Sequence, residues 1–220
     1  MDALSLISPI IPPLKVTDTP EKALIWMDEF RLSDLPIIKD KQLIGIVSEG
    51  ILLDLENVFI PFDKQNIVYK QCAVNQNDHL LKVIKTISEY NVSLVPVLDD
   101  ANLYLGAISF NTILLALGKF STNFQNWSII VLEIPEINYS LVEIAQIVET
   151  NQAKILSLQT SNSEDNNNIE VTLSINTDDL TFIIESFYRY QYVIKDSYHL
   201  DKFKESNEDR FNFLLNYIKI

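Results

Sequence analysis

The stretch that decides the fold is Leu94-Val-Pro-Val-Leu98, followed after a polar turn by Tyr104-Leu-Gly-Ala-Ile-Ser109. Both segments are short, rich in aliphatic and β-branched residues, and bounded by turn-forming residues, a pattern that predicts two paired strands. Because proline removes a donor from the ladder, we expect Pro96 at the start of a strand or on a sheet edge. A helix is predicted to begin directly after Ser109.

The same stretch occurs once earlier in the chain. Leu35-Pro-Ile37 matches Val95-Pro-Val97 at an offset of 60, and the strand ending at Ser48 matches the strand ending at Ser109 at an offset of 61. One supersecondary unit used twice implies two similar halves that pack against each other. Duplicated binding clefts follow from this arrangement more naturally than a single active site.

Each copy also contains a helix upstream of its proline strand. Asp18 and Asp78 occupy matching positions before these helices, and short acidic side chains at such positions are typical of helix N-caps. The complete unit therefore reads as strand, helix, strand, strand and helix.

The pattern changes after residue 126. Strands are predicted over residues 127–134, 153–160, 169–175 and 190–195, with one helix carrying the apolar stripe Leu141, Ile144, Ala145, Val148 and a second helix capped by Asp178. The order βαββαβ is that of the ferredoxin-like, split βαβ arrangement. A last amphipathic helix is predicted over residues 198–220. The whole chain is therefore expected to be α+β.

With both repeats laid out, residues 1–122 resemble a pair of CBS domains, with repeat 1 over about 1–62 and repeat 2 over about 63–122. The resemblance rests on the hydrophobic-Pro-hydrophobic strand and the Gly-x-x-Ser motif, present in both copies. Residues 127–197 resemble an ACT domain. The combination is similar to stand-alone bacterial CBS–ACT regulators of the acetoin-utilisation accessory type, and implies a non-enzymatic sensor that binds an adenine nucleotide or a related adenosyl metabolite.

In CBS pairs the ligand lies between a lead-in strand and the Gly-x-x-Ser/Thr strand. An acid three residues after the hydroxyl holds the ribose, but Ile51 and Thr112 stand at those positions here. We therefore expect weak binding, mainly at the cleft that contains Ser109. The ligand-binding residues implied by the resemblance are Thr17, Ser48, Val74, Val95, Pro96, Ser109 and Thr112.

Composition and motifs exclude several other classes. The formal charge of −13 opposes a nucleic-acid partner, because such affinity comes mainly from neutralising phosphates. The single cysteine, Cys72, fits a reducing compartment, and its surroundings predict a buried hydrophobe rather than a reactive thiol. The sequence shows no catalytic, metal-binding or cofactor motif. With no basic region before its first apolar stretch and no apolar run long enough to span a bilayer, the chain is expected to be cytoplasmic, without a membrane partner.

A homodimer is expected, since single CBS pairs and ACT domains leave apolar faces that two-fold pairing would cover. The face Phe211, Leu214, Leu215 and Ile218 of the last predicted helix is a candidate contributor. The sequence does not name a further protein partner. The alternative to a sensor is a ligand-free CBS–ACT interaction scaffold, in which the clefts are empty and the surfaces carry the function.

Overall fold

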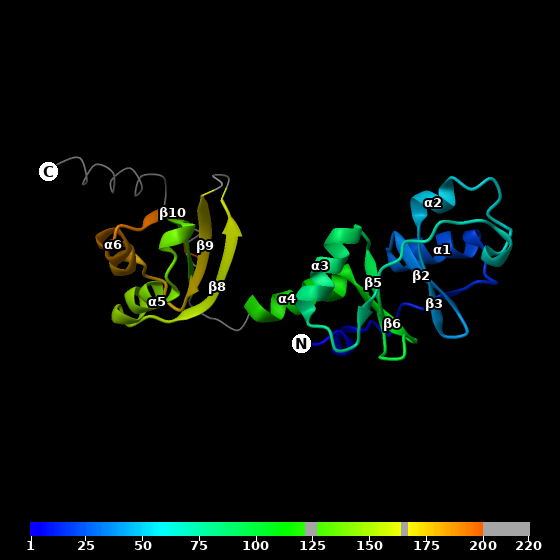
Figure 1. Ribbon diagram of the computed structural model, residues 1–220, viewed down its shortest axis with the longest axis horizontal. Coiled ribbons are helices and arrows are strands. Elements are labelled where there is room, and N and C mark those ends of the chain that lie inside the picture. Colours follow the sequence, from blue (N-terminus) through cyan, green and yellow to red (C-terminus); the bar gives the residue numbers. More distant parts are fainter. Residues whose placement is uncertain (122–126, 164–166, 200–220) are drawn as a thin grey trace. The chain divides into compact units, whose positions relative to one another are not determined.

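The computed structural model describes residues 1–121, 127–163 and 167–199 (Figure 1). The chain divides into two compact units, which we call the N-terminal unit (Met1–Ser121) and the C-terminal unit (Thr122–Ile220). Each unit has its own cluster of buried apolar side chains. The two units therefore have separate hydrophobic cores.

The N-terminal unit contains the same five elements twice, each set forming a three-stranded sheet. In each sheet the first strand pairs in parallel with the central strand, and the central strand pairs antiparallel with the third. The first set is β1 (Leu14–Lys15), α1 (Pro20–Phe30), β2 (Asp34–Lys39), β3 (Gln42–Ser48) and α2 (Glu49–Leu53); the second is β4 (Val74–Asn75), α3 (Leu80–Tyr90), β5 (Leu94–Leu98), β6 (Tyr104–Ser109) and α4 (Phe110–Ser121).

Both repeats contribute to one continuous core. The helices α1 and α3 present equivalent apolar positions to it, with Ala23 and Met27 buried in the first repeat and Val83 and Ile87 in the second. The spacing of four residues places each pair on one helix face. The duplicated sequence pattern is thus a duplicated packing pattern.

The expectation that the prolines lie at strand starts or edges is wrong. Pro36 lies inside β2, the central strand, opposite Ile46 of β3. Ile46 directs both its N–H and its carbonyl away from β2 to Lys70, at 3.0 and 2.9 Å, so Pro36 faces it without a hydrogen bond. On its other side, β1 reaches only Ile37 and Ile38. The missing N–H of Pro36 therefore removes no ladder bond, and the pairing of Pro96 with Ala107 repeats this geometry.

The predicted helix caps are displaced by one residue. Thr19 is the N-cap of α1 and His79 that of α3, rather than Asp18 and Asp78. Each aspartate instead closes the turn before its helix. Asp78 Oδ2 accepts a hydrogen bond from Asn75 N at 2.8 Å, while Asp78 N donates to Asn75 O at 2.9 Å.

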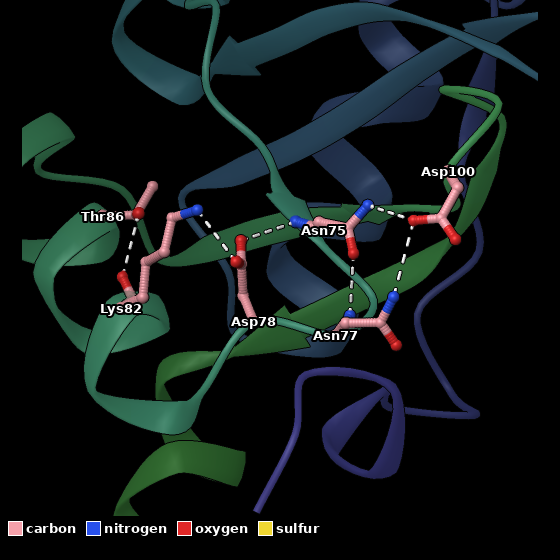
Figure 2. Close-up of polar contacts among 6 residues, drawn as sticks. All are labelled: Asn75, Asn77, Asp78, Lys82, Thr86 and Asp100. Carbon is pink, nitrogen blue, oxygen red and sulfur yellow. Dashed lines mark hydrogen bonds and ion pairs between the residues drawn. The ribbon is translucent and has the colours of Figure 1, made fainter.

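Figure 2 shows the polar contacts around this turn in the second repeat. Lys82 Nζ lies 2.8 Å from Asp78 Oδ1, and Asn75 Nδ2 donates to Asp100 Oδ1 at 3.0 Å. The first repeat has the same lysine pair, with Lys22 Nζ 2.7 Å from Asp18 Oδ1. The aspartate fixes where the chain leaves the short parallel strand and enters the helix.

The C-terminal unit has the element order βαββαβ. Its four-stranded sheet has the order β10-β7-β9-β8 with every neighbouring pair antiparallel. Inward-facing side chains of β7 and β9 pack with those of both helices into one core. The elements are β7 (Ser128–Pro135), α5 (Leu141–Thr150), β8 (Ile155–Asn162), β9 (Asn168–Ile175), α6 (Thr181–Arg189) and β10 (Val193–His199).

The order of strands and helices in this unit agrees with the ferredoxin-like order expected from the sequence. Local signals set the helix starts: Ser140 Oγ accepts from Glu143 N at 3.3 Å at the start of α5. For α6 the predicted cap at Asp178 is wrong, because Leu180 is the N-cap residue. The helix predicted over residues 198–220, with its Phe211 face, lies outside the described residues apart from its first two positions, which belong to β10.

Candidate functional site: two clefts of unequal charge

The two candidate clefts arise where the lead-in segment of each repeat crosses the other repeat. Before β1, Ser8 N donates to Ala107 O in β6 at 2.9 Å. Before β4, Lys70 forms a bridge with Ile46 in β3. Each Gly-x-x-Ser strand is therefore bordered by the other repeat, and each cleft is built from both halves of the unit.

The glycine of each motif permits this crossing. A Cβ built on Gly45 would lie 2.6 Å from Tyr69 Cβ, and one built on Gly106 would lie 2.4 Å from Ile7 Cγ2. Such contacts are closer than carbon atoms can approach, so a side chain at Gly45 would push the lead-in segment away, and one at Gly106 would displace the Ile7 side chain. The glycine of the sequence motif is thus explained by the crossing.

The second cleft is a cavity of about 660 Å³, and its lining includes the hydroxyls of Ser109 and Thr112, which the sequence singled out. Cavities of this size are typical of small-molecule sites. Ser109 Oγ lies 3.0 Å from Thr112 Oγ1 and accepts from Thr112 N at 3.2 Å, so Ser109 caps the first turn of α4. The lining consists of residues 5–11, 30–32, 93, 109–112 and 115.

The first cleft is smaller, with a volume of about 420 Å³ against about 660 Å³ for the second. Its floor is Asp34, whose exposed fraction is only 3%. The lining consists of residues 33–34, 48–50, 70, 91–93 and 110. Ser93 and Phe110 line both clefts, so the two cavities meet at the junction of the repeats.

The Asp34 carboxylate is held by donors from three parts of the unit. Ser48 Oγ donates to Asp34 Oδ1 at 2.8 Å, Ser93 N donates to Asp34 Oδ2 at 2.7 Å, and Lys70 Nζ lies 3.5 Å from Asp34 Oδ1. A buried carboxylate is tolerated only when it is paired and hydrogen-bonded in this way. Ser48 is consequently committed to Asp34 and makes no capping bond to α2.

The charges that line the clefts differ in sign. Asp34, Glu49 and Lys70 line the first cleft, whereas Arg31 is the charged residue that lines the second. Formal charges therefore sum to −1 in the first cleft and +1 in the second. Because the walls of a cleft focus such charges, the second cleft favours an anionic ligand more than the first.

The structure brings together only some of the residues predicted from the sequence. Ser109 and Thr112 share the second cleft, and Ser48 lines the first. Val74 and Val95 are core residues, with exposed fractions of 2% and 0%. Pro96 is buried in β5 and Thr17 is an exposed residue after β1, and neither lines these two clefts.

The reason is that β1 and β4 pair with the central strands and so enter the core. The chain just before each of these strands makes the crossing, and it borders the cleft of the other repeat. Ile7 therefore stands in the second cleft, where Val74 was expected beside Ser109, and Lys70 stands in the first cleft. Sequence reasoning also missed Asp34. Its signal was present, because Asp34 opens an apolar strand at the position where the second repeat has Leu94.

The cysteine near Asp34 is not an activated thiol. Cys72 is buried, and burial raises the pKa of its thiol to about 11, with the charge of Asp34 adding to the effect. The thiol is therefore protonated at neutral pH and is a poor nucleophile. Within residues 1–121, 127–163 and 167–199, no group of three or more His, Cys, Asp or Glu side chains is placed to hold a metal ion. In the same ranges, none of the helices has the length and hydropathy of a bilayer span.

Comparison with known families finds a CBS domain at residues 66–119. These residues comprise the lead-in segment, the proline strand and the Gly-x-x-Ser motif of the second repeat, so the CBS resemblance is confirmed for this repeat. The matched range also includes Lys70 of the first cleft and the hydroxyls of Ser109 and Thr112 in the second cleft.

Solved structures similar to this chain include proteins built on a CBS-domain pair. A CBS domain pair/ACT domain protein from Thermotoga maritima is 21% identical with a TM-score of 0.48, over 54% of this chain and 98% of that chain. CBSX2 of Arabidopsis thaliana, in a complex with AMP, is 19% identical with a TM-score of 0.47, over 55% and 98%. The CBS domains of a transcriptional regulator from Streptococcus pneumoniae are 18% identical with a TM-score of 0.46, over 52% and 98%.

Proposed function

We propose that this protein is a non-enzymatic regulatory sensor whose N-terminal unit binds an adenine nucleotide weakly at the second cleft. One observation carries the proposal: the cavity of about 660 Å³ is lined by the paired hydroxyls of Ser109 and Thr112, which lie within the matched CBS range. Its Arg31 supplies a positive charge at the rim, where a phosphate would be attracted.

Weak binding follows from the hydrogen-bond inventory of this cleft. A neutral hydroxyl, Thr112 Oγ1, stands where a carboxylate would hold the ribose, and a neutral hydrogen bond contributes about 1 kcal/mol, less than a charged one. Arg31 is also paired with Asp28 on the surface, at 3.1 Å. We expect a dissociation constant on the order of 0.1 to 1 mM.

The test is a thermal-shift panel with AMP, ADP, ATP and S-adenosylmethionine on the full chain. At a dissociation constant of about 1 mM, 10 mM ligand stabilises the native state by about 1.4 kcal/mol, which raises the unfolding midpoint by a few degrees. Ser109→Ala should weaken nucleotide binding about fivefold, the loss of one hydrogen bond. The matched control is Ser48→Ala in the first cleft, which should leave the AMP response unchanged.

We also propose that the C-terminal unit is ACT-like, as in CBS–ACT regulators of the acetoin-utilisation accessory type, and that the chain acts as a cytoplasmic homodimer. Its βαββαβ order supports the first statement. Exposed apolar side chains on α4 support the second, since Leu114 and Leu115 are 56% and 64% exposed. Light scattering at micromolar concentration that finds only a 25.3 kDa species would contradict the dimer.

The alternative function is a ligand-free interaction scaffold. The internally satisfied Asp34 of the first cleft favours it, because that cleft needs no ligand to neutralise its carboxylate. Absence of any nucleotide response at 10 mM, together with a stable dimer, is the result that selects the scaffold over the sensor.

A further inference from the structure

The first cleft has a chemical preference of its own, set by Asp34. We propose that Asp34 makes this cleft selective for a phosphate-free adenosyl ligand, neutral or cationic, and excludes the phosphorylated nucleotide that the second cleft accepts. The inference rests on the proposed function of the CBS pair, which it extends from one ligand class to two.

The hydrogen-bond polarity of the cleft is the first argument. The hydroxyl hydrogen of Ser48 is directed to Asp34 Oδ1 at 2.8 Å, so Ser48 Oγ offers only lone pairs to a ligand. Asp34 Oδ2 is bound by the Ser93 N–H at 2.7 Å. A phosphate needs donors at this point, whereas ribose hydroxyls or an amine would bring donors to the acceptors that are present.

Charge is the second argument. Lys70, the cation in the described lining of this cleft, is already engaged: its Nζ donates to Asn91 O at 3.1 Å and lies 3.5 Å from Asp34 Oδ1. The second acid of the lining, Glu49, is exposed at the mouth. A phosphate entering the cleft therefore meets a buried carboxylate whose countercharge is fixed, and like charges at short range in a partly desolvated cavity repel strongly.

The matching position of the second repeat shows what the acid changes. Leu94 occupies the place of Asp34, and Ser109 consequently caps α4 and forms a hydrogen bond with Thr112 in which either hydroxyl can be the donor. The serine is the same in both clefts, but its hydrogen is directed to a carboxylate only in the first cleft.

The experiment compares adenosine with AMP on the isotope-labelled full chain, following backbone amide signals by NMR. In the wild type, adenosine should shift the signals of Ser48–Gly50 and bind there at least tenfold more tightly than AMP. In Asp34→Asn the ratio should fall to twofold or less. In Lys70→Gln, which leaves the carboxylate without its cation, the ratio should rise at least threefold, so the two variants move in opposite directions.

Asp40→Asn is the matched control, because it removes the same charge from the exposed β2–β3 turn outside the cleft, and its ratio should equal that of the wild type. Equal affinities of adenosine and AMP at Ser48–Gly50 in the wild type would overturn the proposal. So would an unchanged ratio in Asp34→Asn, or no shift there with either ligand. The same spectra test the nucleotide site of the second cleft independently. If AMP does not shift the amide signals of Ser109–Thr112, that site is absent, whatever happens at Ser48–Gly50.

Discussion

The two repeats share a backbone plan but differ in how each uses its motif serine. In the second repeat Ser109 caps a twelve-residue helix, α4, and pairs with Thr112. In the first repeat Ser48 donates to buried Asp34, makes no side-chain capping hydrogen bond, and is followed by the five-residue helix α2. The difference begins with a single position, Asp34 against Leu94, and shows that a repeated scaffold can hold two sites of unequal chemistry.

The two repeats also differ at the position of the lysine that pairs with Asp34. Lys70 crosses β3 in the first cleft, and Ser8 crosses β6 at the corresponding place in the second. Asp34 and Lys70 thus form a pair absent from the other repeat, drawn from segments far apart in the sequence. Because a buried acid without its cation is costly, the two positions should behave as one functional element.

The largest loss of stability is expected when an aspartate is introduced into the second repeat, at the position of Asp34, without a lysine to pair with it. Leu94 is fully buried, so Leu94→Asp should reduce the free energy of unfolding by about 3–5 kcal/mol. Adding Ser8→Lys should restore at least about 1 kcal/mol, because it supplies the cation at the position equivalent to Lys70. Urea denaturation followed by circular dichroism measures both values.

The reciprocal change tests the same comparison from the other side. Asp34→Leu removes the acceptor of Ser48 and Ser93 N and should cost about 2–3 kcal/mol, less than Leu94→Asp. A Leu94→Asp variant as stable as the wild type, or a double variant no more stable than the single one, would show that charge pairing does not explain the asymmetry.

Alanine at the two motif glycines should destabilise the protein to different extents, because the two lead-in segments approach these glycines differently. Gly45→Ala places a Cβ 2.6 Å from Tyr69 Cβ and 3.1 Å from the Lys70 carbonyl, at a φ of +153° that side chains rarely adopt. It should destabilise the protein by about 2–4 kcal/mol. Gly106→Ala meets only the Ile7 side chain, which can turn aside, and should cost about 1 kcal/mol. Equal losses in urea melts would refute the distinction.

Much of the fold followed from local patterns. The repeat placed both proline strands and both Gly-x-x-Ser strands, since their period-2 apolar residues face a core that either repeat must build. Helix caps were misplaced by one residue because Asp18 and Asp78 bind the backbone three residues upstream instead of the helix itself. Both roles use the same residue type, and the sequence does not distinguish them.

The clefts were harder to predict, because they are formed by contacts between repeats. Ser109 and Thr112 are neighbours in sequence, and the motif identified them. Lys70 and Asp34 are 36 positions apart and meet only because the lead-in segment crosses the other repeat. No spacing rule links two such positions, so the partner of the acid became visible only in three dimensions.

The smallest difference between the repeats is expected at Asp18 and Asp78, which occupy the same turn in each. Burial raises the pKa of Asp18 and of Asp78, but hydrogen bonds from Lys22 or Lys82 and from the backbone outweigh it, so both pKa values lie below the ordinary 3.8. The stabilisation from each turn is therefore complete above pH 3.8 and is lost as the pH falls through the lowered folded-state value. Asp18→Asn and Asp78→Asn should each cost about 1 kcal/mol at pH 7.

The two losses should be nearly equal, with Asp18 slightly the more important. Lys22 is 40% exposed against 62% for Lys82, and its Nζ also lies 4.3 Å from the centre of the Trp26 ring, so it is more firmly held. Urea melts at pH 7 and at pH 3 measure this, since the difference between each variant and the wild type should shrink at the lower pH. A loss that stays constant with pH would show that the aspartates act through shape alone, without a contribution from their charge.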